Sequence, residues 1–216
     1  MGCMKRILVC IIMVLALGGT VFLSSVQTEF ENTLERLENE GYNVECIVKE
    51  NDTITGRKIT LKVFLDSVLT EELEFVKEKK CGGIRYEYDE AGVLRKSVRY
   101  IYAEEQEMKS ACRIYDAHGN LLEYEQYFEG RLWKTDHYRY DEKDRLISHS
   151  DSMGPGCIQE YSYAEMYIYD NEKILREEKY VNGNLESMLV YKYDQHGKLI
   201  ETNEYRRGKL VETTRH

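Results

Sequence analysis

Proline is nearly absent from this chain, and clusters of basic residues and closely spaced cysteine pairs are missing. The single proline, Pro155, excludes long extended linkers, so the 216 residues are expected to form one domain with at most a short appendage. A formal net charge of −9 without clustered Lys and Arg excludes a nucleic-acid-binding surface, because phosphate contacts need concentrated positive charge. The 42% hydrophobic and 32% charged residues that remain are typical of a globular protein with a buried core.

The N-terminal segment, residues 1–28, predicts export. Lys5 and Arg6 precede an uncharged apolar run over residues 7–23, as in the charged and hydrophobic regions of an export signal. Thr20 stands where a lipoprotein needs cysteine, which argues against lipidation. No Ala-x-Ala follows the apolar run, so cleavage and retention as an uncleaved membrane anchor both stay open. In either case we expect the remainder to be extracellular or at the cell surface.

The six cysteines contain no Cys-x-x-Cys spacing, which argues against the common zinc sites. Two of them lie in the export segment. The other four form either disulfides outside the cell or isolated thiols within a β core. These four are Cys46, Cys81, Cys112 and Cys157.

Tyrosine reveals an internal repeat. Of 18 tyrosines, 17 lie between residues 86 and 205. They recur in the phrase Tyr-x-Tyr-Asp-x-x-Gly-x-Leu, whose Asp residues are 27, 25, 29 and 24 residues apart and are each followed by Leu five residues later. Because Asp binds the backbone two residues on and Gly accepts positive φ, each copy predicts a turn, although Asp144 and Lys173 replace Gly in copies three and four. The predicted turns are at Asp89, Asp116, Asp141, Asp170 and Asp194.

A shorter phrase, Tyr-x-x-Gly-x-Leu, occurs at Tyr127, Tyr180 and Tyr205, so a turn arrives every 11 to 13 residues. We therefore predict a mainly β fold in which residues 84–216 form one antiparallel β-hairpin repeat sheet of about five units. Leu and Tyr recur six residues apart, and simple alternation places such pairs on one face. That face is either the core of the sheet or a binding surface. We expect it to be buried, with Leu94, Leu121, Leu132, Leu146, Leu175 and Leu199 on it.

The long phrase resembles the YD repeat of RHS-type proteins, and the short phrase is similar to the bacterial MORN-like repeat. The resemblance covers about residues 84–216. In that family the repeats form β-hairpin spirals at the cell surface, and in large members they enclose a toxin. Here the copies are too few for a closed shell, and no toxin domain or autocleavage segment is evident. The resemblance implies an architecture and a cell-surface context rather than an activity.

The stretch before the repeats, residues 29–83, predicts a short helix followed by strands. Apolar residues recur at helical spacing over residues 29–40. Strands are expected over 42–49 and 58–65. Residues 65–80 fit either a second helix or a degenerate repeat unit, and we favour the repeat unit.

Three patterns resemble catalytic or metal sites, and each has a simpler structural interpretation. His118 and His196 occupy the same position of an Asp-x-His-Gly motif in two different turns, and they are interpreted as polar turn residues rather than metal ligands. The run Ser148-His149-Ser150-Asp151 holds the residue types of a hydrolase triad, but neighbours in a strand alternate direction and cannot assemble one. One carboxylate per turn supplies too few oxygens for calcium. We therefore expect no catalytic residue, metal or cofactor.

Recognition residues are expected where the copies differ, because positions shared by all copies serve the fold. The third unit is interrupted by Gly154-Pro155-Gly156, and loops on rigid scaffolds often carry recognition, with a tolerated insertion as the alternative. Trp133, Arg206 and Arg207 are further departures of a type common in interfaces. We expect a non-catalytic protein that binds a protein or glycan at the bacterial cell surface and contacts the membrane only through its N-terminal segment. The alternative is an immunity (antitoxin-like) partner of a polymorphic toxin.

Overall fold

The computed structural model describes residues 28–52, 56–155 and 161–216, so the predicted export segment before residue 28 lies outside these ranges. Within them, no helix is long and apolar enough to cross a membrane. One helix is followed by 14 strands, which form a single sheet. The elements are α2 (Glu29–Asn39), β1 (Asn43–Asp52), β2 (Gly56–Leu65), β3 (Val68–Val76), β4 (Lys79–Tyr88), β5 (Leu94–Ala103), β6 (Gln106–Tyr115), β7 (Leu121–Phe128), β8 (Arg131–Tyr140), β9 (Leu146–Met153), β10 (Ser162–Asp170), β11 (Lys173–Val181), β12 (Asn184–Tyr193), β13 (Leu199–Arg206) and β14 (Lys209–Arg215).

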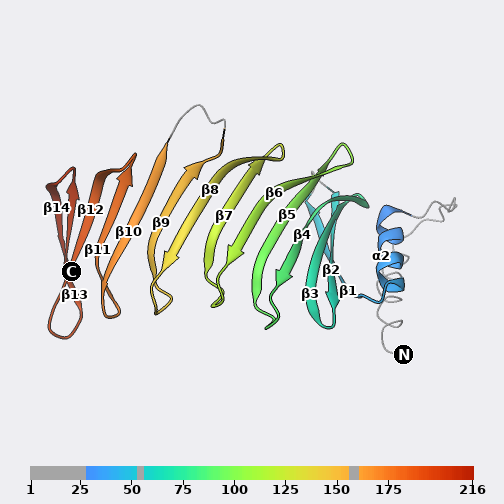
Figure 1. The fold of residues 1–216 in the computed structure, drawn as a ribbon, viewed down its shortest axis with the longest axis horizontal. Helices are drawn as coiled ribbons and strands as arrows, with labels where there is room; N and C mark the ends of the chain where they lie inside the picture. The colour runs from blue at the N-terminus through green and yellow to red at the C-terminus, as the bar shows by residue number, and fades with distance from the viewer. Residues whose placement is uncertain (1–27, 53–55, 156–160) are drawn as a thin grey trace.

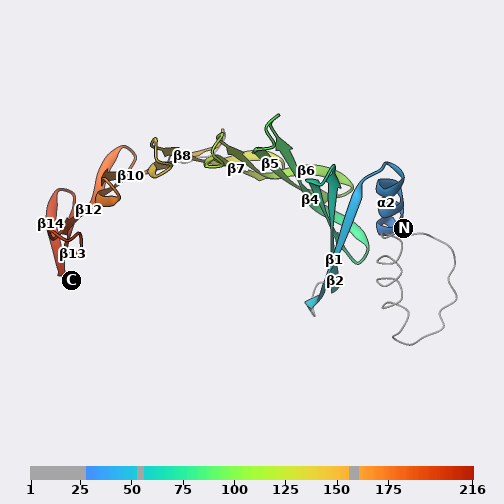
Figure 2. The same cartoon turned by 90° about the horizontal axis from the view of Figure 1, so that it is seen from below.

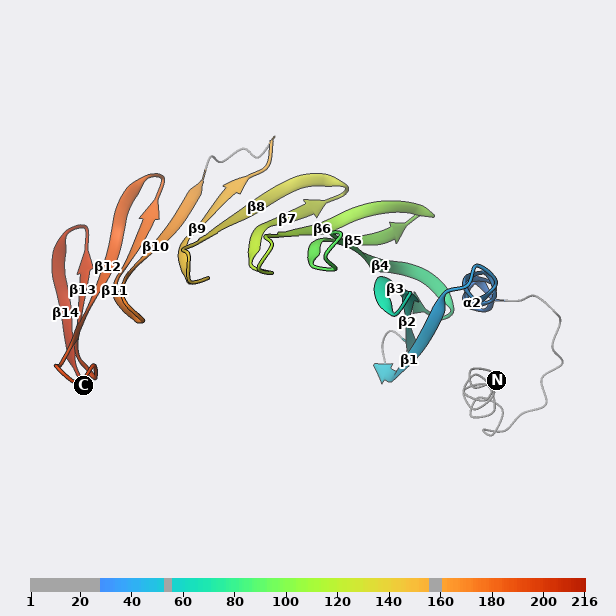
Figure 3. The same cartoon turned by 60° about the horizontal axis from the view of Figure 1, so that its bottom comes forward.

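Each strand pairs antiparallel with the next one in sequence, which confirms the predicted mainly β hairpin-repeat fold. The strands form one layer that bends into an arch, with α2 beside its β1 end (Figure 1, Figure 2, Figure 3). Turns therefore lie alternately along two long margins. We call the margin with the Asp turns the Asp-turn margin (lower edge in Figure 1) and the margin with Gly154 and Pro155 the loop margin (upper edge).

In the Asp turns, one carboxylate holds the chain reversal. The Asp89 carboxylate accepts the N–H groups two and four residues on, at 3.0 and 2.9 Å. Gly92, at φ +79°, donates its N–H to the Asp89 carbonyl. Asp144 takes the corresponding left-handed position in copy three, at φ 59°. The carboxylate bonds recur at Asp116, Asp141 and Asp194.

The fourth copy turns differently. Asp170 is the last residue of β10 and pairs with Lys173, so only Asn171 and Glu172 form the turn. The shorter turn places the left-handed backbone conformation at Asn171, at φ 50°, and Asn tolerates this conformation better than Lys does. The turn lies where the sequence predicts it, but the Asp side chain does not have the same structural role.

The elements before the repeats also match their predictions. Residues 29–39 form α2, which begins with a capping box between Thr28 and Glu31. β1 and β2 cover the two expected strands, and residues 65–80 form the hairpin of β3 and β4 rather than a second helix. The sheet runs without interruption from this region into the repeats.

The packed core lies at the α2 end of the arch. Phe30 of α2 packs edge-on against Phe75, with ring centroids 5.5 Å apart. We call the face of the sheet that carries this cluster the helix-side face and the opposite one the far face. The buried members of the cluster are Leu37, Ile59, Leu61, Val63, Leu73, Phe75 and Tyr100.

Tyr100 fills space that two glycines leave open. Its side chain is 1% exposed, and its hydroxyl donates to Glu71 at 2.7 Å. A Cβ at Gly83, directly opposite, would lie 2.5 Å from the Tyr100 hydroxyl oxygen. A Cβ at Gly82 would lie 2.5 Å from the Tyr100 carbonyl oxygen. Glycine in β4 is therefore required by the aromatic ring and by the backbone of β5.

β-Bulges overturn the predicted face of the Leu and Tyr side chains. In the hairpin of β4 and β5, Tyr88 pairs with Leu94 while Glu87 pairs with Lys96, which leaves Arg95 as an extra residue. The extra residue reverses the alternation, so Leu94 lies on the far face with Tyr88 and Tyr100 lies on the helix-side face. Every strand pair except β9–β10 contains such an irregularity. The prediction that residues six apart share one face is wrong.

The predicted burial of six leucines is also wrong. Leu175 is a bulge residue and 36% exposed, and Ile174 takes its place opposite Tyr169. Leu132 pairs with Tyr127 on the helix-side face, away from the other leucines. The rest are half-buried, because within the described ranges no second layer covers β5–β14. The six are Leu94, Leu121, Leu132, Leu146, Leu175 and Leu199.

In three of the five copies, the second Tyr of the phrase joins its hairpin to the one before it. Tyr169 donates its hydroxyl to the carbonyl oxygen of Leu146, and Tyr193 does so to that of Ile174, each at 2.9 Å. Tyr88 makes the same bond to Leu69. In these three copies, the hydroxyl of the second Tyr therefore links neighbouring hairpins.

Candidate functional site

The interrupted third unit lies at the loop margin, between β9 and β10. Gly154 is buried and donates its N–H to the Trp133 carbonyl at 2.7 Å. A Cβ on Gly154 would overlap the Leu132 carbonyl oxygen, so this position needs glycine. Gly154 therefore extends the pairing of β9 with β8, and the chain is exposed from Pro155. Gly156, the third predicted contact of this loop, lies outside the described residues.

Trp133 is the bulge residue of the hairpin of β7 and β8. Gln126 pairs with Lys134 and Tyr127 with Leu132, which leaves Trp133 as the extra residue. Its side chain is 46% exposed. The bulge therefore presents the only tryptophan of the chain at the loop margin, next to Gly154.

Trp133 belongs to a row of apolar side chains along this margin. Strand register places Ile101, Phe128 and Met153 on the far face. Phe128 is 68% exposed and Ile101 is 41% exposed. Tyr161, directly before β10, is 46% exposed. We call this row the loop-margin stripe; from β5 to the start of β10 its members are Ile101, Met108, Phe128, Trp133, Met153 and Tyr161.

A cluster of ionisable side chains lies beside the stripe on the far face. Asp136, 5% exposed, lies 2.9 Å from Lys134 Nζ and 3.2 Å from His149 Nε2. Lys134 Nζ also lies 3.0 Å from Asp151 Oδ2. His149 Nδ1 lies 3.8 Å from Glu165 Oε2. Acids and bases from three strands therefore alternate across the sheet and hold β8, β9 and β10 together.

The acids of this cluster are held in their charged form. Burial tends to raise the pKa of Asp136, but hydrogen bonds from Lys134 and His149 outweigh burial and hold the pKa below its usual value. Glu165 behaves in the same way, with hydrogen bonds from Tyr163 and Tyr167 opposing burial and lowering the pKa. Burial together with the bond to Glu165 raises the pKa of both tyrosines.

The Ser148-His149-Ser150-Asp151 run is divided between the two faces. His149 and Asp151 belong to the far-face cluster. Ser148 pairs with Arg139, and Ser150 with His137, on the helix-side face. Strand alternation separates both hydroxyl groups from the imidazole, as argued from the sequence.

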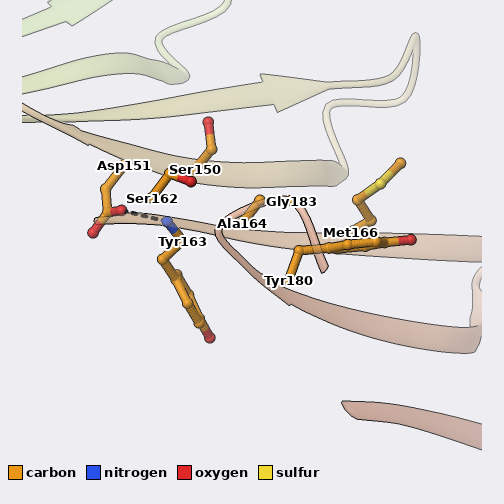
Figure 4. A pocket seen from close by; sticks show the side chains of 8 residues that line it. All are labelled: Ser150, Asp151, Ser162, Tyr163, Ala164, Met166, Tyr180 and Gly183. Carbon is orange, nitrogen blue, oxygen red and sulfur yellow. Dashed lines mark hydrogen bonds between the residues drawn. The ribbon is translucent and has the colours of Figure 1, made fainter. Parts of the chain in front are cut away.

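A shallow depression of about 400 Å³ lies next to the interrupted hairpin (Figure 4). Strand alternation places Ala164, Met166 and Tyr180 on the helix-side face, whereas Tyr163 belongs to the far face and points away from Met166 in Figure 4. The depression and the loop-margin stripe therefore border the same hairpin from opposite faces. The lining residues are Ser150, Asp151, Ser162, Tyr163, Ala164, Met166, Tyr180 and Gly183.

The predicted basic contacts do not join this region. Arg206 and Arg207 lie at the turn between β13 and β14, on the same margin but beyond β11 and β12. Arg206 pairs with Glu204 at 2.7 Å and Arg207 with Glu186 at 3.2 Å. Their side chains are 67% and 79% exposed. The structure places them apart from Trp133.

The histidines of the Asp-x-His-Gly motifs make contacts within or between the Asp turns. His118 Nδ1 lies 2.8 Å from the Asp144 carboxylate of the next Asp turn, whereas His196 contacts its neighbour Gln195. Among the residues that the structure describes, no group of three or more His, Cys, Asp or Glu is placed to hold a metal ion.

No disulfide joins the cysteines of the described residues to one another. Cys46, Cys81 and Cys112 are not joined to one another, and Cys157 lies outside the described residues. Burial raises the pKa of the Cys81 and Cys112 thiols. For Cys81 and Cys112, the isolated-thiol alternative therefore applies.

Sequence reasoning identified Trp133 but missed the other exposed members of the stripe. Phe128 directly follows the Tyr of the short phrase, where the other copies have Val181 and Arg206. That difference between copies was the available signal. Ile101 and Tyr161 have no such mark, because only the hairpin register brings them to the margin beside Phe128.

Comparisons with known proteins add a family and a distant structural likeness. A protein-family model described as "Uncharacterised protein" matches residues 65–196. No curated protein matches the chain. Among solved structures, the crystal structure of TcdB2-TccC3-Cdc42 is similar at 13% sequence identity and a TM-score of 0.28, covering 76% of this chain and 10% of that chain.

Proposed function

We propose that this chain, which belongs to the protein family described as "Uncharacterised protein", is a non-catalytic module that binds a protein or glycan at its loop margin. The observation that carries the proposal is the loop-margin stripe, a row of apolar and aromatic side chains where the repeat is interrupted; four of its six members are exposed and the two methionines are half-buried. Contiguous exposed apolar patches mark interaction sites. Aromatic side chains offer a large contact area with few rotatable bonds.

The polar residues near the stripe support binding rather than catalysis. Lys134, Asp136 and His149 are engaged with one another across strands. The serines that would complete a hydrolase triad lie on the other face. A network of polar contacts across the strands therefore lies beside the stripe and favours a pre-organised contact surface.

We also propose that the repeats are related to the YD repeats of RHS-type proteins and to MORN-like repeats. Support comes from the copies of the tyrosine phrase, the Asp turns, and the hydroxyl bonds that join one hairpin to the preceding one. Export to the cell surface is part of the proposal and rests on Lys5, Arg6 and the apolar run that follows. N-terminal sequencing of the membrane and culture fractions distinguishes a cleaved signal from an anchor.

Site-specific photo-crosslinking in cells tests the binding function. Trp133 is replaced by a photo-reactive amino acid in the full chain, and a matched variant carries the same group at Leu210 on β14. Leu210 is 55% exposed and lies on the helix-side face, far from the stripe. We expect a discrete adduct from position 133 and none from position 210. Equal adducts from both positions, or none from position 133, would contradict a specific site at the loop margin.

A further inference from the structure

The loop-margin stripe has a length that can be worked out from the sheet. Its six members occupy five consecutive strands and the residue before the sixth. With about 4.8 Å between neighbouring strands, five spacings give a stripe about 24 Å long. An α-helix of about 16 residues has this length, at about 1.5 Å per residue.

The spacing of the stripe also suits a helix better than an extended chain. A helix presents apolar side chains on one face once per turn of about 5.4 Å, close to the strand spacing. An extended segment repeats on one face only every 6.8 Å or so, which falls out of step within a few strands. A helix laid across the strands can therefore contact each member of the stripe in turn.

The turns beside the stripe specify the charge of that helix. Glu104 and Glu105 form the turn of the β5–β6 hairpin, and Glu129 lies in the turn of the β7–β8 hairpin. All three are exposed, and none has an ion-pair partner among the residues that the structure describes. Between β5 and β10, Arg131 on the same margin offsets only one of these charges, and Lys134 is paired with Asp136 and Asp151. With a net charge of −9 for the chain, the surroundings favour a basic partner.

We propose that the loop-margin stripe holds a basic amphipathic helix of a partner protein, which lies across β5–β10. The apolar face of the helix packs on Phe128, Trp133 and their neighbours. Its Lys or Arg side chains lie over Glu104, Glu105 and Glu129. This inference rests on the proposed binding function and selects a protein helix over a glycan.

The probe is a synthetic 16-residue peptide that has Leu at helical spacing and Lys elsewhere, and no tryptophan. It is titrated into the full chain, and because Trp133 is the only tryptophan, its emission reports directly on burial of the stripe. Two control peptides have the same composition in scrambled order, or the same apolar spacing with Glu in place of Lys. We expect a blue shift only with the basic amphipathic peptide.

Three variants localise the contact, and far-UV circular dichroism shows that each remains folded. Phe128→Ser should weaken binding about tenfold or more, equivalent to about 1.4 kcal/mol. Glu104→Gln combined with Glu105→Gln should weaken binding and reduce its dependence on salt. Leu210→Ser, a change of similar exposure on the other face, should have no effect.

Several results would overturn the helix proposal. They are equal binding of the acidic peptide, equal loss with Leu210→Ser and Phe128→Ser, or unchanged Trp133 emission. A shift produced by phosphatidylcholine–phosphatidylglycerol vesicles would assign the stripe to a lipid surface instead. A glycan adduct from position 133 would contradict the helix proposal but not the proposed binding function. Absence of the site-specific adduct would contradict both proposals.

Discussion

The change Gly83→Ala adds one methyl group where the sheet has no room for it. The new Cβ would overlap the Glu72 carbonyl oxygen and would lie 2.5 Å from the hydroxyl oxygen of Tyr100 and 2.8 Å from its Cζ. The overlap with Glu72 requires β3 and β4 to move apart, and the contacts with Tyr100 require its ring to shift. Both responses damage the cluster that packs against α2.

The expected cost follows from what Tyr100 loses. Its side chain is 1% exposed, and its hydroxyl bonds Glu71 at 2.7 Å, so displacement exposes the ring and breaks the bond. Removing a packed aromatic side chain costs about 3–5 kcal/mol, and overpacking without displacement costs about 1–3 kcal/mol. We expect Gly83→Ala to lower the free energy of unfolding by about 3 kcal/mol, where the two ranges meet.

Urea unfolding followed by circular dichroism measures this loss. The control is Gly92→Ala, at φ +79° with no atom near the new methyl group, which should cost only about 1–2 kcal/mol of backbone strain. Combining Gly83→Ala with Tyr100→Ala should cost less than the sum of the two single changes, because the ring clash is then absent. If Gly83→Ala is no more damaging than Gly92→Ala, the packing argument is refuted.

Three further predictions concern turns and strand contacts. Arg145→Gln should raise the pKa of Asp141 from about 2 toward an ordinary value, because the Arg145 hydrogen bond is the main cause of the low pKa. Carbon-13 NMR titration of the Asp141 carboxyl group measures this pKa. An unchanged titration midpoint would exclude the Arg145 hydrogen bond as the cause. Since the folded pKa lies below the unfolded one, the stability from this pair is complete above about pH 4 and is lost as the pH falls through the folded pKa of about 2. Replacing Glu104-Glu105, at φ 50° and 66°, by Asn-Gly should raise the free energy of unfolding by about 1 kcal/mol, and an unshifted urea midpoint would show that the turn is not strained. Tyr193→Phe removes one inter-hairpin hydrogen bond and should lower the local stability of β11 and β12 by about 0.5–1.5 kcal/mol, measured as faster amide hydrogen exchange in these strands. Unchanged exchange would show that this bond does not stabilise the hairpins.

The sequence predicts the hairpin architecture well because its turns are chemically marked. Asp at the first turn position and Gly three residues later supply a side-chain acceptor and a left-handed residue, and the Asp89 turn uses both. The faces of the strands were predicted wrongly because a bulge carries no such mark. Arg95 and Leu122 look like ordinary strand residues, yet each reverses the alternation that follows.

The candidate site could be predicted only in part for the same reason. Trp133 was found as an unusual residue within a repeat. Ile101 and Phe128 are 27 residues apart in sequence and share a margin and a face only because of bulges and register in the intervening strands. A surface assembled from single side chains of successive hairpins leaves no local signal in the sequence.

A sheet one strand deep has an unusual consequence for how disturbances spread. Each strand packs chiefly against its two neighbours in sequence, so stability is close to a sum of nearest-neighbour terms along one axis. A destabilising change in β11 or β12 should therefore leave the free energy of local opening of β4 and β5 unchanged. In a globular core, the same change would affect many elements that pack on the altered residue. A helix bound across β5–β10 would clamp the strands it spans and leave β1–β3 and β12–β14 free to open independently.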